Sequence, residues 1–143
     1  MRTYRNIYGM WRDERGTSAI EFAMLATLFF TLVFGIVIYG TYFASLIIVQ
    51  HIASEAARAT LSGLTDDERS TLAHSRADEV KDSFLSFINS ATFQVDATPA
   101  GQGLYEVTVS QNFDSFGLTN LSVFLPLPPS QQTATVQVSH GGY

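Results

Sequence analysis

The sequence predicts an α+β protein in which a long N-terminal transmembrane helix extends into a small domain with a second helix and a three-stranded antiparallel sheet. A charge-free apolar run near the N-terminus predicts the long helix. After position 92 the spacing of the apolar residues changes from three or four to two, which predicts strands. A length of 143 residues allows one small domain.

Composition excludes several classes of protein. The chain is 46% hydrophobic and 15% charged, with a net charge of −5. It has no cysteine, which excludes a disulfide scaffold, a thiolate metal site and a cysteine nucleophile. An acidic chain without a basic stripe attracts phosphate backbones weakly, so we expect no nucleic-acid partner.

The apolar run is the strongest signal in the chain. No charged residue occurs between Glu21 and Glu55, and Phe22–Val49 spans 28 residues, against about 20 needed to cross the hydrocarbon of a bilayer. A cleaved secretory signal has an apolar region of only about 7 to 15 residues. We therefore expect a retained anchor in membrane lipid. The alternative is a buried helix of a soluble protein, but the rest of the chain is too short to cover such a helix on every face.

Charge on either side of the run predicts its orientation. Four of the eight basic residues precede position 16, and the acidic residues lie mostly after the run. The positive-inside rule then places the N-terminus in the cytoplasm and the remainder outside.

The helical pattern continues beyond the run and then restarts. Residues 50–63 keep alanines at helical spacing as far as Gly63, and Thr65 with Glu68 forms a capping box that predicts the start of a second helix or a kinked continuation. One face of this second segment is apolar, which requires a partner surface. Its members are Ala73, Ala77, Val80, Phe84, Phe87 and Ile88.

Three segments alternate with the period of a strand. Residues 93–98 and 105–110 flank a turn at 99–103 and predict a β-hairpin, and residues 133–139 predict a last strand. Between them, residues 112–132 contain several apolar side chains and three prolines, which forbid central-strand pairing. We expect this segment to pack as an extended flap over the sheet or against a neighbouring protein.

The residues at the start of the apolar run form a motif. Arg15–Phe22 reads RGTSAIEF, with a basic leader before Gly16 and a single carboxylate, Glu21, at the edge of the run. This resembles a prepilin processing site, and Arg15–Gly63 resembles the TadE-like family of pseudopilins, minor subunits of tight-adherence (Flp-type) pili. The resemblance implies a pilin-like fold and cleavage after Gly16 by a membrane aspartyl peptidase. Major pilins of this system usually carry tyrosine after the glutamate, whereas Phe22 suits a minor subunit.

Cleavage after Gly16 would make Thr17 the new N-terminus. Its ammonium would lie four residues before Glu21, about one helical turn away or within reach from a neighbouring subunit. In a filament core an unpaired carboxylate costs several kcal/mol, so pairing would set the register between subunits. The alternative is that Glu21 is a first-turn acid favoured by the helix dipole, worth about 0.3 to 1 kcal/mol.

Small residues within the helix suggest close packing against other helices. Gly40 and Ala44 form a small-xxx-small pair, and Gly35 would also allow close approach. Tyr39 and Tyr42 suit either an aromatic belt or contacts within a helix bundle.

No pattern in the chain predicts catalysis, a metal site or a cofactor. The three histidines lack zinc-type spacing, and the acids at 66–68 suit a helix N-terminus better than a cation site. No nucleophile elbow or triad pattern occurs. We expect neither an enzyme nor a small-molecule substrate.

These expectations combine into one functional hypothesis. Residues 1–16 form a cleaved leader, 17–63 the transmembrane and exit helix, and 64–143 an extracytoplasmic α+β domain. The resemblance implies a minor pilin of the bacterial inner membrane that acts in pilus assembly and could enter the surface pilus. Its partners would be lipid, other pilins and pseudopilins, the prepilin peptidase and the tight-adherence assembly machinery. The alternative is an uncleaved single-pass anchor that presents an external binding module.

Overall fold

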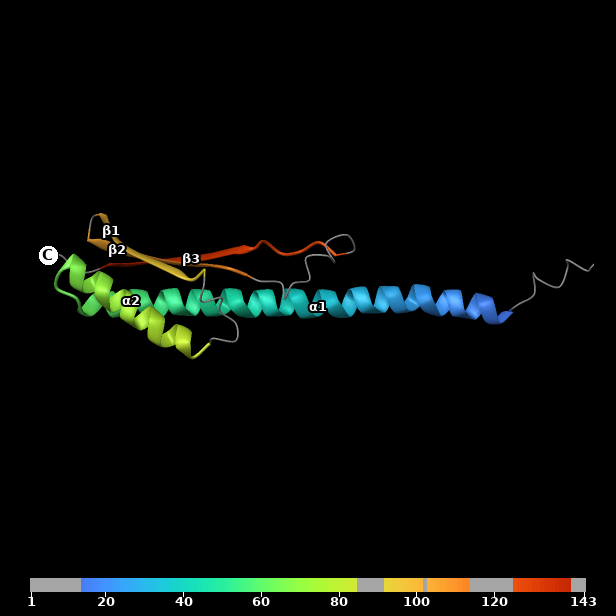
Figure 1. The fold of residues 1–143 in the computed structure, drawn as a ribbon. Helices are drawn as coiled ribbons and strands as arrows, with labels where there is room; N and C mark the ends of the chain where they lie inside the picture. The colour runs from blue at the N-terminus through green and yellow to red at the C-terminus, as the bar shows by residue number, and fades with distance from the viewer. Residues whose placement is uncertain (1–13, 85–91, 102, 114–124, 140–143) are drawn as a thin grey trace, which may run out of the picture. The chain divides into compact units, whose positions relative to one another are not determined.

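The computed structural model describes residues 14–84, 92–101, 103–113 and 125–139. It contains the predicted long helix, second helix and three-stranded antiparallel sheet, which confirms the α+β fold (Figure 1). The chain divides into two compact units, Met1–Ile36 and Val37–Tyr143. The elements in chain order are α1 (Glu14–Ala59), the 3₁₀ turn η2 (Thr60–Ser62), α2 (Asp66–Asp82), β1 (Gln94–Gly101), β2 (Leu104–Asn112) and β3 (Gln131–Ser139).

The two helices are separate elements, joined by a tight turn at Gly63. After η2 the backbone of Gly63 is extended, with ψ at 138°, so α2 is not a kinked continuation of α1. Gly63 is buried. A Cβ added there would lie 2.7 Å from Cγ of Arg69 and 2.9 Å from its backbone nitrogen. Only a residue without a side chain allows α2 to approach this closely.

Helix α2 begins with the predicted capping box. The Thr65 hydroxyl accepts a hydrogen bond from the backbone N–H of Glu68 at 3.3 Å, and the Glu68 carboxylate accepts one from the Leu64 N–H at 2.9 Å. The first contact satisfies a donor that the first turn of a helix leaves free, and the second fixes the backbone just before the helix. Ala73, Ala77 and Val80 are buried, as the apolar stripe predicts, and Phe84 is partly buried. The predicted stripe members Phe87 and Ile88 lie outside the described residues.

The strands are longer than their sequence patterns. The sheet has the order β1-β2-β3 with antiparallel pairing throughout. β1 continues to Gly101 and β2 starts at Leu104, so the hairpin turn is tighter than the predicted 99–103. Gly101 and Gly103 hold φ values of 79° and 76°, which other residues rarely adopt. β3 begins two residues before the predicted Thr133, at Gln131.

The core lies within the Val37–Tyr143 unit, where the sheet and α2 pack against the C-terminal half of α1 (Figure 1). Many of the core residues of the two helices are alanines, which let helix backbones approach one another and the sheet. The buried core residues are Val49, Ile52, Ala53, Ala56 and Ala57 from α1, Ala73, Ala77 and Val80 from α2, and Tyr105, Val107 and Val109 from β2.

Candidate functional site

The first half of α1 is apolar and uncovered. Within Met1–Ile36, ten large apolar side chains of the described residues are at least 42% exposed and occur on every side of the helix, while Val33 is half-buried. They are Ile20, Phe22, Met24, Leu25, Leu28, Phe29, Phe30, Leu32, Phe34 and Ile36. The helix is long and apolar enough to cross a membrane, and its most apolar 18 residues have a mean hydropathy of 2.4. The charge-free run begins at Phe22, directly after Glu21, and continues beyond Ile36 to Val49, which exceeds the roughly 20 residues that a span requires.

Hydroxyl groups in this stretch are compatible with lipid because they bond to their own helix. Thr27 donates to the carbonyl of Ala23, and Thr31 to the carbonyl of Thr27, each at 2.8 Å. A bonded hydroxyl costs less in hydrocarbon than a free one. These threonines therefore add no unsatisfied donor to this exposed apolar surface.

The predicted processing and charge-pairing residues all lie near the start of α1. Gly16, Thr17, Glu21 and Phe22 are exposed, and Phe22 is 73% exposed. Helix ends fray, so the Gly16–Thr17 bond, within the first turn of α1, is in the part of the helix that opens most easily. Thr17 and Glu21 are one turn apart on the same helix face.

The predicted packing residues occupy different surroundings. Gly40 is exposed, and a Cβ added there would meet nothing within 4 Å. Ala44, one turn further on, is half-buried, and so is Gly35 in the other unit. Gly40 thus has open space beside it, whereas Ala44 is partly covered.

A buried polar network connects α1 to the ends of β2 and β3. The Gln132 Oε1 atom accepts hydrogen bonds from the Ser45 hydroxyl at 2.5 Å and from Gln111 Nε2 at 2.9 Å. Gln132 Nε2 in turn donates to the Tyr42 carbonyl at 3.1 Å. Ser45, Gln111 and Gln132 are each at most 2% exposed. Such a network is stable in one relative position of its members, so it sets the position of the sheet along α1.

Gln111 and Gln132 were not predicted as site residues, because each lies one residue outside a predicted strand, 105–110 and 133–139 respectively. Both residues continue an inward-facing alternation: Tyr105, Val107 and Val109 lead to Gln111, and Val138, Val136 and Ala134 lead to Gln132. The signal was therefore present as a period of two, but the polar side chains concealed its extension.

Two tyrosines attach the proline-rich segment to α1. The Tyr39 hydroxyl donates to the carbonyl of Pro126 at 2.8 Å, and the Tyr42 ring meets Phe113 edge-on at a centroid distance of 5.4 Å. The described end of the segment, 125–130, thus contacts the helix, while residues 114–124 lie outside the described part. Both tyrosines contact their own domain, an arrangement that the sequence left open.

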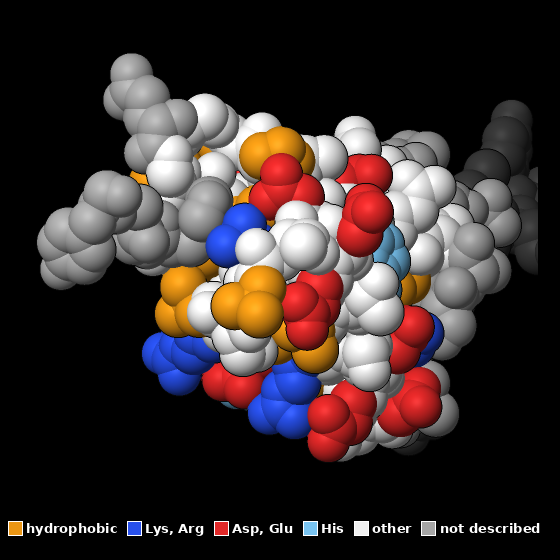
Figure 2. Space-filling view, turned by 90° about the vertical axis from the view of Figure 1, so that its left-hand side faces the viewer, with side chains coloured by type: hydrophobic (Ala, Val, Ile, Leu, Met, Phe, Trp, Pro, Cys, Tyr) orange, Lys and Arg blue, Asp and Glu red, His pale blue; other side chains and the backbone are white. Residues whose placement is uncertain are grey.

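A charged cluster joins α1 to α2 in the domain. The Arg76 guanidinium lies 2.8 Å from the Glu55 carboxylate and 2.9 Å from that of Glu79. Arg76, by donating a hydrogen bond, lowers the pKa of the Glu55 carboxyl below its usual value, against an opposing effect of burial. Figure 2 looks onto the end of this unit where α1 turns into α2, and acidic and basic side chains lie interspersed there.

We expect Glu55→Gln to destabilise the domain in a pH-dependent way. Because the folded-state pKa of Glu55 is lowered, its contribution is present above the ordinary carboxyl value of 4.5 and is lost as the pH falls through the lowered value. The melting temperatures of wild type and variant should therefore differ at pH 7 and converge as the pH falls through that lowered value. Glu79→Gln is the control, since the Glu79 side chain is 71% exposed and should contribute little. A difference that stayed constant between pH 7 and pH 3 would contradict this assignment.

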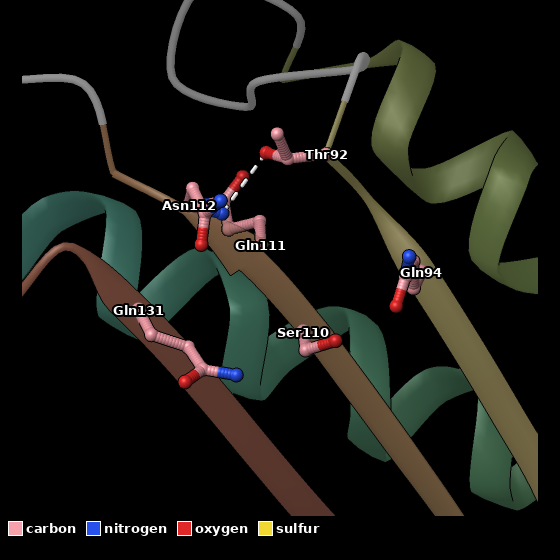
Figure 3. A pocket seen from close by; sticks show the side chains of 6 residues that line it. All are labelled: Thr92, Gln94, Ser110, Gln111, Asn112 and Gln131. Carbon is pink, nitrogen blue, oxygen red and sulfur yellow. Dashed lines mark hydrogen bonds between the residues drawn. The ribbon is translucent and has the colours of Figure 1, made fainter.

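A shallow depression at one end of the sheet is lined by neutral polar residues (Figure 3). The Asn112 backbone N–H donates to the Thr92 hydroxyl at 2.9 Å beside it. Six residues line the depression, and their side chains can hydrogen-bond but carry no charge. They are Thr92, Gln94, Ser110, Gln111, Asn112 and Gln131. Within the described ranges, no cluster of three or more histidine, aspartate or glutamate side chains could hold a metal ion.

One family of known proteins is similar to most of α1. Residues 16–58 match the family model of the TadE-like protein. The match begins at the predicted processing glycine and ends one residue before the end of α1. No curated protein and no solved structure matches the chain. The family match, over 43 of the 143 residues, confirms the resemblance seen in the RGTSAIEF motif.

Proposed function

We propose that this chain is a minor pilin of a tight-adherence pilus, cut after Gly16 and inserted in the bacterial inner membrane until it assembles with other pilins. The family match carries the proposal, and TadE-like pilins are a structural family. The exposed apolar side chains between Phe22 and Ile36 support it, because such a surface requires lipid or other helices around it. On this proposal residues 1–16 are the leader, 17–63 the anchor and exit helix, and 64–143 the domain outside the cytoplasm.

The proposed order of events follows from charge and burial. In the membrane, Glu21 lies at the cytoplasmic edge of the span, where its carboxylate can still reach headgroups and water. Cleavage adds an ammonium at Thr17. When the helix moves into a bundle, the carboxylate and an ammonium can pair, either within one chain or between neighbours, and this pairing selects one axial register. Assembly machinery and the peptidase are the partners that this sequence of events requires.

Processing is tested by co-expression with a prepilin peptidase, followed by N-terminal sequencing. We expect a product that begins at Thr17 and has 127 residues, 143 minus the 16 of the leader. Gly16→Leu should block cleavage. Gly40→Leu is the matched control, because Gly40 is also an exposed helical glycine, and it should be cut like wild type. An intact chain beside a peptidase that cuts its own pilin would favour the uncleaved anchor instead.

The register role of Glu21 is tested separately. Glu21 is exposed, so Glu21→Ala should leave the fold and the cleavage unchanged. We expect incorporation into pili to fall at least tenfold, since about 1.4 kcal/mol corresponds to a factor of ten and an unpaired buried charge costs more. Glu21→Gln should show a similar loss, while Glu79→Ala, at a side chain that is 71% exposed, should not. Normal incorporation of Glu21→Ala would refute the charge-pairing role.

A further inference from the structure

The two outer edges of the sheet differ. β1 and β3 are the edge strands, because the order is β1-β2-β3. An edge strand carries backbone N–H and C=O groups that point away from the sheet and can pair with another chain. Which residues point outward follows from the alternation of an antiparallel pair.

One hydrogen bond determines this alternation for β3. The Phe113 N–H donates to the Ser130 carbonyl at 2.5 Å, next to the register pair of Asn112 and Gln131. Every second pair from there exchanges hydrogen bonds, so even-numbered β3 residues direct their backbone groups toward β2. Odd-numbered residues direct theirs to the outer edge: Gln131, Thr133, Thr135, Gln137 and Ser139.

The edge of β1 is occupied by its own domain. By the same alternation, Val95, Ala97 and Pro99 point outward. The Val95 carbonyl lies 3.1 Å from Nε2 of His74 on α2, and the Ala97 carbonyl accepts from the Tyr105 hydroxyl at 3.1 Å. Pro99 has no N–H to offer. These are the protections by which proteins prevent edge-to-edge pairing.

Among the described residues, none of these protections is found at the edge of β3. Residues 131–139 contain no proline and no charged side chain. In the part of the chain that the structure describes, β3 pairs with β2 alone. Its inward side chains Ala134, Val136 and Val138 remain half-buried, whereas Val107 and Val109 beside them are fully buried. A further strand at this edge would pair the backbone groups and cover those side chains.

A second copy of this chain does not suit this edge. β3 starts beside Ser45 and runs along α1 in the same direction as the helix (Figure 1). A two-fold axis normal to the sheet would pair β3 with its copy antiparallel, and the two helices would then run in opposite directions. A two-fold axis along the strand would leave the helices parallel but put equivalent side chains on opposite faces, which a regular sheet does not allow. Two copies anchored in one membrane in the same orientation therefore cannot pair here.

We propose that the β3 edge binds an extended segment of a second protein, which adds a fourth strand to the sheet. Main-chain hydrogen bonds to the five outward-facing residues would provide the affinity. The segment would alternate apolar residues, against Ala134, Val136 and Val138, with neutral polar ones. The free edge is a property of the sheet, and only the exclusion of a second copy rests on the proposed membrane anchor; neither depends on cleavage at Gly16.

Amide hydrogen exchange tests the inference on the full chain in detergent. The probe is a synthetic peptide with the sequence of residues 131–139, which is free of the membrane constraint and can pair antiparallel through a central Thr135. Without peptide, odd-numbered β3 amides should exchange at least tenfold faster than even-numbered ones. With peptide, the odd-numbered amides should become protected. Slow exchange of the odd-numbered amides without peptide, or no change on its addition, would overturn the proposal.

Methylation of backbone nitrogens in the peptide distinguishes binding through main-chain hydrogen bonds from non-specific binding through side chains. Methylation at the positions of Thr133, Thr135 and Gln137 should abolish binding. Methylation at the positions of Ala134, Val136 and Val138 should leave binding unchanged, because the backbone N–H groups of these peptide residues point away from β3. On the protein, Thr133→Pro should weaken binding at least tenfold without loss of a bond to β2, and Thr133→Lys serves if the proline variant does not fold. Equal binding of both methylated peptides would contradict strand addition.

Assignment to a second protein has its own test. The chain has no cysteine, so Thr135→Cys introduces a single thiol at the centre of the edge. In membranes we expect no disulfide-linked homodimer under mild oxidation, because equally oriented copies cannot pair. A homodimer formed there, and lost with Thr133→Pro, would show that the occupant is a second copy.

Discussion

Replacement of Gln132 with alanine should lower the free energy of unfolding of the domain by about 3 kcal/mol. The change removes the acceptor of the Ser45 hydroxyl and of the Gln111 amide, together with the donor to the Tyr42 carbonyl. A buried polar group left without a partner costs about 1 to 3 kcal/mol. Thermal melting of the full chain in detergent, monitored by near-ultraviolet circular dichroism, measures the effect.

Gln137→Ala is the matched control for this prediction. Gln137 lies on the same strand and also hydrogen-bonds, to the Glu106 carboxylate at 2.7 Å, but on the exposed face. We expect a change within about 0.5 kcal/mol, as for most surface substitutions. Equal losses for the two variants would mean that the buried network contributes nothing special to the position of the sheet on α1.

Gly63→Ala should destabilise the domain by about 1 to 3 kcal/mol, the usual range for inserting atoms into a packed site. The new methyl group would lie 2.9 Å from the backbone nitrogen of Arg69. Backbone cannot move aside as a side-chain end can, so α2 would have to shift away from α1. The melting temperature of the full chain measures this loss.

The control for Gly63 is Gly40→Ala, and its expected sign is opposite. Gly40 is an exposed glycine within α1, and an added Cβ meets nothing within 4 Å. Alanine favours the helix over glycine by up to about 1 kcal/mol, so this variant should be neutral or stabilised. If Gly63→Ala were also neutral, the close approach of the two helices would not depend on the missing side chain.

Local signals in the sequence predicted most of the elements. The uncharged run, the Thr65 and Glu68 pair and the alternation from 93 to 110 each depend on neighbours along the chain, which is why they could be read. The lengths of the strands could not be predicted from the sequence. The polar Gln111 and Gln132 face inward because Ser45, from a distant part of the chain, offers them a hydrogen-bond partner.

The candidate site was predictable in part for the same reason. Gly16, Thr17, Glu21 and Phe22 form a contiguous motif, and the structure adds that they are exposed at the start of α1. The contacts of Tyr39 and Tyr42 with the segment after β2 depend on tertiary packing. Helical periodicity shows which side chains share a face but not which face its own domain covers, so the exposure of Gly40 could not be read from the sequence.

The central claim is that α1 has a lipid-facing first part and a domain-covered second part outside the cytoplasm. Single cysteines at Leu28 and Ser54, in this cysteine-free chain, test it directly when intact spheroplasts are treated with a membrane-impermeant maleimide. Leu28 is 67% exposed in the isolated chain, so only lipid or other helices could protect it. We predict rapid labelling at Ser54 and none at Leu28; equal labelling of the two, or labelling of Leu28 alone, would contradict the account.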